Sequence, residues 1–405
     1  MKAWQLDRLG GTLKLDNAPI PEPRPGSVIV KIEASALMSY LKAYVEGRLP
    51  IYSPPEGRFT PGGNAIGIVH EVGPEVYHLK PGQRVVVSSH VVADETVPEP
   101  AQFLLGITAG GPDGKALQAD WRDGTLAEYV RAPKGSVTAI DGLDAINPAE
   151  LAVLPRFAVP YGGLIRARLT AGETIIVTGA TGSYGTAAVL LAVALGAARV
   201  VAAGRNVTKL DALARLGGPR VATVALSGDI KADAESLRAA AAGGAQAALD
   251  IVGNAQDPNA TLAALRALPR GGRLVLMGSM GVPLPIPYLD VMLNNLEIIG
   301  QFMYPRDVFR RLGELARSGL LNINAIRTRS FPLDALASAM EAAAQADGLE
   351  CVVVKPSWKR LPNRQTRSTP CKCCNTLSAS PSRATNSSRR SRSTNGFKAY
   401  AASAG

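Results

Sequence analysis

Three glycines follow a short β-branched run near the middle of this 405-residue chain. Residues 174–178 read Thr-Ile-Ile-Val-Thr, and Gly179, Gly182 and Gly185 come after them. Glycine at such a turn lets the backbone approach a pyrophosphate, and the first amides of a following helix attract the anion. The spacing departs from G-x-G-x-x-G, because Ala180 stands at the first position. The pattern predicts dinucleotide binding, and a tight strand-to-helix turn without a ligand is the alternative.

The pair Gly204-Arg205 stands where the strand after this motif should end, with Arg205 20 residues beyond Gly185. An Asp or Glu here would bind the ribose 2′-hydroxyl of NAD and repel a 2′-phosphate. A small residue beside a guanidinium, with Lys209 a turn further on, suits that phosphate instead. The sequence therefore predicts NADPH over NADH.

The predicted cofactor site takes its residues from the carboxyl ends of successive strands, where open α/β sheets bind ligands. Asp250 ends one of these strands, and we expect it to close the strand end through backbone hydrogen bonds. The full predicted set is Gly179, Thr181, Gly182, Ser183, Tyr184, Gly185, Gly204, Arg205, Asn206, Lys209, Val252, Gly253, Gly278, Ser279, Phe302 and Met303.

Strands and helices must alternate after about residue 151 if these residues are to meet. The pattern predicts strands at 174–178, 199–203, 221–226, 247–252, 272–277 and 296–301, with helices at 187–195, 206–216, 232–242, 259–268 and 305–318. This alternation predicts an α/β fold with a parallel, doubly wound sheet. The earlier part of the chain has short strands separated by Gly and Pro, which predicts a β-rich distorted barrel. Its expected strands are 27–34, 65–72, 85–88 and 126–132, and a last strand is expected at 351–355.

The formal net charge of +11 is concentrated at the carboxyl end. Residues 357–405 hold ten Lys and Arg and no Asp or Glu, which leaves 34 basic against 33 acidic residues, a net of +1, for 1–356. This tail is rich in Ser, Thr, Asn and Arg, so we predict a disordered segment, either an altered reading frame or a fused extension. A weak contact of the tail with RNA or anionic lipid is the alternative.

Cysteine usage and the amino terminus both bear on location. Cys371, Cys373 and Cys374 lie in the tail, which leaves only Cys351 in the body and argues against a disulfide framework. The chain begins without an apolar signal segment, and it has no apolar run long enough for a bilayer. We therefore expect a soluble, cytoplasmic protein.

Over residues 1–356 the sequence resembles the medium-chain dehydrogenase/reductase superfamily. The landmarks that carry the resemblance are the Pro-rich segment 19–26, Pro61-Gly62, Glu71-Val-Gly73, 80–85, Ala171-Gly172 and 271–278. The resemblance implies a GroES-like catalytic domain at 1–150, completed by about 319–356, and a Rossmann NADP-binding domain at 151–318. It also implies a homodimer in which residues 296–301 pair as an edge strand across a two-fold axis.

Zinc-dependent members of that superfamily carry Cys, His and Glu ligands at positions that here read Met38, Gly63, Asn64 and Pro155. A thioether, a glycine and an amide cannot hold a catalytic Zn²⁺, and the cysteines of a structural zinc lobe are also missing. His70, His78 and His90 are the only histidines, and their spacing gives no metal site. The sequence therefore resembles the zinc-lacking branch, which includes quinone oxidoreductase-like and alcohol dehydrogenase-like proteins.

Hydride transfer to a carbonyl builds negative charge on oxygen, and without a metal a hydrogen-bond or proton donor must stabilise it. Relatives without zinc sometimes use a tyrosine. The candidates are Tyr40, Tyr44, Tyr52 and Tyr161, of which we favour Tyr44 and then Tyr161. For each of them alone, the residue type favours a core or lining residue over a catalyst.

The prediction is a zinc-independent, NADPH-dependent oxidoreductase that acts on a carbonyl, enone or quinone small molecule. One alternative is an NADP-dependent alcohol dehydrogenase of simple alcohol/ketone pairs. The other is a non-catalytic, cofactor-bound binding or regulatory protein, with nucleic acid contacted only by the tail.

Overall fold

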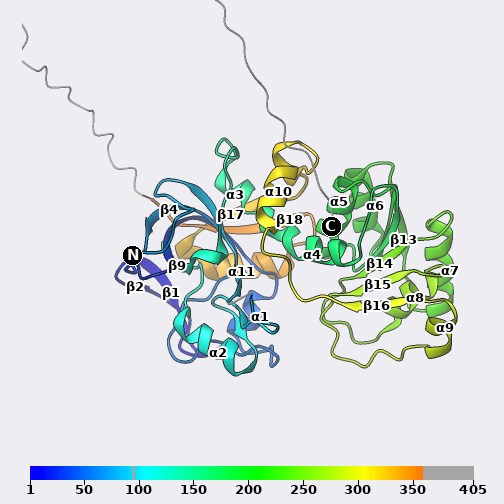
Figure 1. The fold of residues 1–405 in the computed structure, drawn as a ribbon, viewed down its shortest axis with the longest axis horizontal. Helices are drawn as coiled ribbons and strands as arrows, with labels where there is room; N and C mark the ends of the chain where they lie inside the picture. Colours follow the sequence, from blue (N-terminus) through cyan, green and yellow to red (C-terminus); the bar gives the residue numbers. More distant parts are fainter. Residues whose placement is uncertain (94–95, 359–405) are drawn as a thin grey trace, which may run out of the picture. The chain divides into compact units, whose positions relative to one another are not determined.

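Six parallel strands form one sheet of the computed structural model, which describes residues 1–93 and 96–358 (Figure 1). The strand order β13-β12-β11-β14-β15-β16 is that of a doubly wound sheet, with its switch point between β11 and β14. The strands are β11 (Thr174–Thr178), β12 (Arg199–Gly204), β13 (Val221–Ala225), β14 (Ala247–Asp250), β15 (Arg273–Leu276) and β16 (Glu297–Gly300).

The central strand β11 is buried on both faces because its residues alternate between two apolar clusters. Ile175 and Val177 pack in one cluster, and Ile176 packs in the other. Helices α5 (Ser183–Ala194) and α6 (Val207–Gly217) contribute to the first cluster, whereas α7 (Ile230–Ala240) and α8 (Asn259–Ala267) contribute to the second. A continuous β-branched run therefore makes a strand covered on each side.

A seven-stranded sheet brings the two ends of the folded chain together. Its order is β10-β5-β4-β3-β18-β17, with β9 also paired to β3. Strand β18 pairs antiparallel with β3 through Val353 and Ala36, so the last strand completes the amino-terminal sheet. The strands are β3 (Ser27–Ala36), β4 (Ala65–Val72), β5 (Arg84–Val87), β9 (Tyr129–Pro133), β10 (Val137–Ala139), β17 (Arg327–Pro332) and β18 (Glu350–Lys355).

The smaller elements surround these sheets. A hairpin of β1 (Lys2–Gln5) and β2 (Lys14–Asn17) and a three-stranded sheet of β6 (His90–Val92), β7 (Gln102–Leu104) and β8 (Thr108–Ala109) add short strands. The remaining helices are α1 (Leu41–Val45), α2 (Gly111–Asp120), α3 (Pro148–Leu151), α4 (Ala158–Arg166), α9 (Tyr288–Leu293), α10 (Val308–Arg317) and α11 (Leu336–Gln345).

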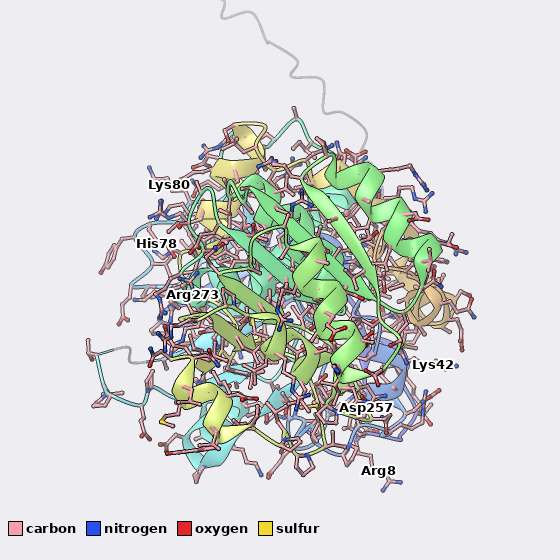
Figure 2. All side chains as sticks on the ribbon, turned by 90° about the vertical axis from the view of Figure 1, so that its right-hand side faces the viewer. Arg8, Lys42, His78, Lys80, Asp257 and Arg273 are labelled. Carbon is pink, nitrogen blue, oxygen red and sulfur yellow. The ribbon has the colours of Figure 1, made fainter. Side chains whose placement is uncertain are left out.

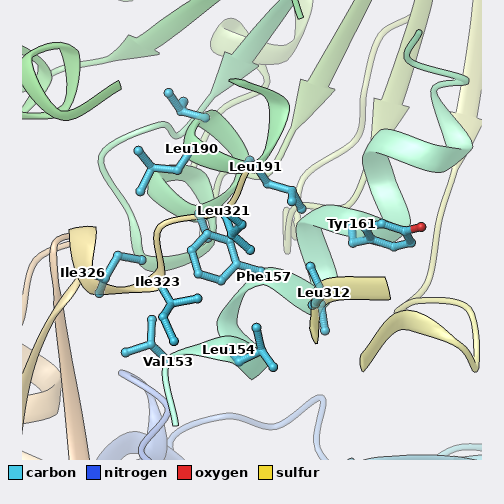
Figure 3. Packing of buried hydrophobic residues seen from close by; sticks show 14 of the residues in the cluster. Val153, Leu154, Phe157, Tyr161, Leu190, Leu191, Leu312, Leu321, Ile323 and Ile326 are labelled. Atoms are coloured by element: carbon cyan, nitrogen blue, oxygen red, sulfur yellow. The ribbon is translucent and has the colours of Figure 1, made fainter. Parts of the chain in front are cut away.

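Phe157 lies at the centre of a packed group just before α4 (Figure 3). Its ring is fully buried among apolar side chains that include Leu154, Leu312 and Leu321. Such close packing holds the preceding residues of the 3₁₀ segment Leu154–Phe157 in place. Charged side chains such as Arg8 and Lys80 are instead exposed at the surface (Figure 2).

The predicted fold class is confirmed, and the errors lie at element ends and in unpredicted helices. Helix α5 begins at Ser183, four residues before the predicted start, because the helix includes Gly185. The strand predicted at 126–132 begins only at Tyr129. Helix α4 was not predicted, since Pro160 and the pair Gly162-Gly163 argue against a helix in sequence alone.

The predicted domain boundaries stay a prediction, because residues 1–357 form one compact unit by their contacts. The tail predicted at 357–405, with its three cysteines, lies outside the described residues from Lys359 onward. In the part of the chain that is described, no helix combines the length and the apolar character needed to cross a membrane.

Candidate cofactor and active site

Two glycines of the turn after β11, Gly179 and Gly185, have no room for a side chain. Gly179 has φ +68°, and a Cβ added there would lie 3.0 Å from the Cα of Val252. A Cβ added at Gly185 would collide with the carbonyl oxygen of Gly179. Gly182 precedes α5 and offers no side chain to cap the first amides of that helix. A cradle of this kind fits a pyrophosphate.

Other predicted cofactor residues lie together at the carboxyl edge of the same sheet. A Cβ added at Gly204 would lie 3.3 Å from Cγ2 of Thr181, and one added at Gly278 would lie 2.5 Å from the carbonyl oxygen of Val252. Gly253 and Ser279 form a parallel β-bridge. The close approach of three strand ends leaves backbone, not bulky side chains, along this edge. The residues present thus fit a dinucleotide, whose binding stays a prediction.

The residues predicted to bind the 2′-phosphate are exposed after β12. Asn206 has a structural part, since its Oδ1 accepts a hydrogen bond of 3.0 Å from the backbone amide of Lys209 and caps α6. Among the described residues, the guanidinium of Arg205 has no hydrogen-bond or ion-pair partner. It is therefore available to an anion.

Asp250 is buried and closes the switch point mainly through side chains. Its Oδ1 accepts a hydrogen bond of 2.6 Å from Oγ1 of Thr178, and its Oδ2 accepts one of 2.8 Å from Oγ1 of Thr261. The expected backbone bond is limited to a contact of 3.4 Å with the amide of Val252. A carboxylate in this position joins β11, β14 and α8.

A small cavity of about 50 Å³ lies beside the first turn of α5. It brings together Met38, Asn64 and Pro155, three of the four positions that the resemblance matches to zinc ligands. The fourth, Gly63, is close by, since a Cβ added there would lie 3.8 Å from Sδ of Met38. The lining residues are Ala36, Leu37, Met38, Ser39, Tyr40, Asn64, Pro155, Arg156, Ser183, Tyr184 and Cys351.

The side chains around this cavity do not form a zinc donor set. Oδ1 of Asn64 already accepts a hydrogen bond of 2.8 Å from the backbone amide of Ser89, and Pro155 has no side-chain donor atom. Cys351 supplies a thiol, but burial raises its pKa and disfavours the thiolate that zinc binds. Within residues 1–93 and 96–358, no cluster of three His, Cys, Asp or Glu side chains could hold a metal ion. Zinc sites require such ligands.

The two tyrosines predicted as catalytic do not line this cavity. Tyr44 is fully buried, and its hydroxyl donates a hydrogen bond of 2.6 Å to the carbonyl of Ile107. Tyr161 packs beside Leu312, with its hydroxyl pointing away from the labelled apolar side chains (Figure 3). Their catalytic roles stay predictions that this geometry does not favour. Tyr40 and Tyr184 line the cavity instead.

The two cofactor residues predicted after β16, Phe302 and Met303, differ in their exposure and contacts. Phe302 is exposed, and its ring centroid lies 5.8 Å from that of His90 in an edge-on arrangement. Met303 has φ +54° and packs against two apolar clusters, while its carbonyl would collide with a Cβ at Gly162. This strained residue fixes the path of the chain between β16 and α10.

Two residues near the glycine turn were missed. A Cβ at Gly348 would lie 2.7 Å from the carbonyl oxygen of Gly182, so the loop before β18 packs on the turn. Nη1 of Arg156 donates a hydrogen bond of 2.8 Å to the carbonyl of Glu350 and ties the cavity to the same strand. In the sequence Gly348 is an isolated glycine, and nothing there indicates that it contacts the turn at Gly182.

Comparison with known proteins agrees with this geometry. A family model described as zinc-binding dehydrogenase matches residues 184–318, and one described as alcohol dehydrogenase GroES-like domain matches residues 24–142. An alcohol dehydrogenase of Moraxella sp. (strain TAE123) is 31% identical over 331 residues, which cover 79% of this chain and 89% of that protein. The chain belongs to the medium-chain dehydrogenase/reductase superfamily.

Two further members illustrate the range of similar proteins. A sorbitol dehydrogenase of Bacillus subtilis (strain 168) is 27% identical over 348 residues, covering 84% of this chain and 93% of that protein. A solved structure described as a zinc-binding dehydrogenase from Sinorhizobium meliloti 1021 bound to NADP has a TM-score of 0.71 and 25% identity. It covers 88% of this chain and 99% of that one. As a member of this superfamily, the chain is an oxidoreductase of the dehydrogenase type.

The raised pKa of Tyr184, which lines the cavity, predicts how folding stability depends on pH. Burial raises its pKa from 10.0 to about 12, so between these pH values the unfolded chain releases a proton that the folded chain keeps. Folding stability must therefore fall as pH rises through this window, by about 1.4 kcal/mol per pH unit for one such proton. Tyr184→Phe should reduce the slope of the free energy of unfolding against pH by that amount, as measured by urea unfolding. Tyr77→Phe, at an exposed position, is the matched control, and equal slopes in all three proteins would contradict the raised pKa of Tyr184.

Proposed function

We propose that this protein is a zinc-independent, NADPH-dependent oxidoreductase that reduces a carbonyl, enone or quinone. The observation that carries the proposal is the cavity beside α5. Met38, Asn64 and Pro155 converge there, as zinc ligands do in related enzymes, but without a thiolate, imidazole or carboxylate among them. The position of the site is kept, and the side chains suit hydrogen bonding to a substrate oxygen.

The cofactor half of the proposal rests on the exposed guanidinium of Arg205 and the absence of a carboxylate at the end of β12. Gly179, Gly182 and Gly185 would hold the pyrophosphate, and Arg205 with Lys209 would hold the 2′-phosphate. The Sinorhizobium structure, which contains NADP, supports this choice. A bound NADPH would supply a hydride to the substrate carbon, and water would supply the proton that completes the product.

The tyrosines of the cavity are suited to donate hydrogen bonds. Burial raises the pKa of Tyr40 well above its usual value, and it also raises that of Tyr184. Both hydroxyls therefore keep their protons at neutral pH. Arg156 adds a cation to the lining. A polar group entering between these side chains would meet donors, which favours an oxygen that gains negative charge.

A second candidate is an alcohol dehydrogenase of simple alcohol/ketone pairs that depends on NADP. The similar proteins named alcohol dehydrogenase and sorbitol dehydrogenase favour it. We also propose a cytoplasmic location, since Cys351 is a free, buried thiol.

The reaction is tested with purified protein, NADPH and three probes, namely 2-cyclohexen-1-one, 9,10-phenanthrenequinone and cyclohexanone. We expect NADPH oxidation with the enone or the quinone, unchanged by prior dialysis against a chelator, and no stoichiometric zinc by elemental analysis. Activity on cyclohexanone alone would favour the second candidate. Stoichiometric zinc whose removal abolishes turnover would contradict zinc independence.

Cofactor choice is tested with Arg205→Ala. Removing a hydrogen bond to a charged group costs about 1.5–3 kcal/mol, so we expect roughly 10- to 100-fold weaker NADPH binding and little change for NADH. Fluorescence titration with both dinucleotides measures this difference. Arg8→Ala, at an exposed arginine, is the control and should change neither affinity. An equal loss for the two dinucleotides, or tighter NADH binding by the wild type, would refute the proposed phosphate contact.

We also propose a homodimer through β16, the last strand of its sheet. Nearby helix α9 buries none of its residues, and Tyr288, Leu289 and Leu293 are exposed by 76%, 65% and 59%. An apolar surface beside an unpaired strand edge favours association. Leu289→Glu should shift sedimentation at micromolar concentration from dimer toward monomer, whereas Ile51→Glu, another exposed position, should not. A monomeric wild type would exclude the dimer.

A further inference from the structure

Asn64 occupies a distinct place in the cavity, directly before β4. It is half-buried and lines the cavity together with Met38 and Pro155. In zinc-dependent relatives the matching position carries a carboxylate, whereas here the group is a neutral amide. An amide presents an acceptor on one side and a donor on the other, so its function depends on which way it points.

The orientation of this amide is determined by a backbone donor. The N–H of Ser89 lies 2.8 Å from Oδ1 of Asn64, and the hydroxyl of Tyr304 also donates to Oδ1 at 3.4 Å. Because a backbone N–H can only donate, the atom that faces it must be the oxygen. The NH₂ group of Asn64 is therefore turned away from both donors.

The Nδ2 atom of Asn64 has no acceptor among the described residues. In the same part of the chain, Nε of Arg273 is the only buried side-chain nitrogen or oxygen without a partner. Nδ2 of Asn64 must therefore be accessible to solvent, and the cavity is the space that Asn64 lines. The result is a fixed N–H donor that no group of residues 1–93 and 96–358 uses.

Tyr304 supports this arrangement from behind. Its hydroxyl lies 3.1 Å from Oγ of Ser88, and Ser88 in turn donates to the carbonyl of His90. The rings of His90 and Phe309 pack edge-on against Tyr304, at 5.4 and 5.7 Å between centroids. The acceptor side of Asn64 is therefore held by buried groups.

We propose that Nδ2 of Asn64 donates a hydrogen bond to the substrate oxygen on which negative charge develops, and so takes the electrostatic part that zinc has in related enzymes. This inference rests on the proposed reduction of a carbonyl compound. The amide keeps its own protons, and solvent supplies the proton of the product. Arg156 is less suited to this part, because its Nη1 is already held by the carbonyls of Gly348 and Glu350.

The experiment uses two variants and two readouts. Asn64→Leu removes both polar atoms, and Asn64→Asp keeps the acceptor for Ser89 but replaces the donor. The exposed Asn324→Leu is the matched control. The first readout is NADPH-dependent turnover of 2-cyclohexen-1-one. The second is the infrared C=O stretch of carbonyl-¹³C-labelled 2-cyclohexen-1-one bound to protein and NADP⁺, which needs no turnover.

In the wild type we expect the C=O band at lower frequency than in Asn64→Leu, because a donated hydrogen bond weakens the carbonyl bond. Turnover should fall about 10²- to 10³-fold in Asn64→Leu, the usual cost of removing one oxyanion donor. Asn324→Leu should match the wild type in both readouts. Melting temperature and NADPH affinity, measured for each protein, separate this loss from misfolding.

Asn64→Asp distinguishes a hydrogen-bond donor role of Asn64 from a purely structural role. A carboxylate cannot donate, whereas a protonated carboxyl can, so its band shift and turnover should both recover as pH falls from about 8 to 5. The nearby Tyr40, Tyr184, Tyr304 and Cys351 have raised pKa values and stay neutral in this range. Burial lowers the pKa of His90, and the wild-type profile provides the baseline for any effect of that residue.

The outcomes separate the two proposals. A wild-type C=O band that is absent, or unchanged in Asn64→Leu, would overturn the role of Asn64, even if turnover is present. A shifted band without turnover of any of the three probes would uphold the role of Asn64 and refute the proposed reductase function. Turnover that is equal in the wild type and both Asn64 variants would also overturn the inference.

Discussion

The contact between the backbone of Gly179 and Gly185 is the constraint on which the arrangement of this site depends. Any side chain at Gly185 would meet the carbonyl of Gly179, so β11 and α5 can approach this closely only through two glycines. Their approach directs the amino end of α5 toward the carboxyl edge of the sheet. The loop at Gly348 then packs on the same turn, which brings β18 and the amino-terminal sheet beside it. The cavity lies where these parts meet.

The cavity is lined by residues that the resemblance matches to zinc ligands, but their side chains have different chemistry. A metal ion would concentrate two positive charges at one point, whereas this lining offers neutral donors and one guanidinium. Neutral donors need exact placement, because their attraction depends on direction as well as distance. The hydrogen bonds of Ser89 and Tyr304 to Asn64 supply such placement, and the buried packing around Tyr304 keeps it.

Much of the doubly wound fold could be predicted because its signals are local. The strand at 174–178 was predicted with its observed limits, since a β-branched run between glycines is typical of a buried strand. The positions matched to zinc ligands come from the resemblance to the superfamily, and that assignment stays a prediction. The return of Gly348 to the glycine turn could not be predicted, because nothing near Gly348 encodes its distant partner. The orientation of Asn64 was likewise beyond sequence, since it is set by Ser89 and Tyr304, which lie 25 and 240 residues away.

The donors in the cavity also bear on which substrates are plausible. Reducing a simple ketone places nearly a full negative charge on one oxygen, which a metal ion stabilises strongly. Reducing an enone or a quinone spreads that charge over a conjugated system, so less stabilisation is required at any one atom. The lining offers moderate stabilisation of negative charge. It comes from one fixed amide, two neutral tyrosine hydroxyls and a guanidinium that already donates to a backbone carbonyl. The electrostatics of the lining therefore support our proposal of a conjugated acceptor, independently of the cofactor that would supply the hydride.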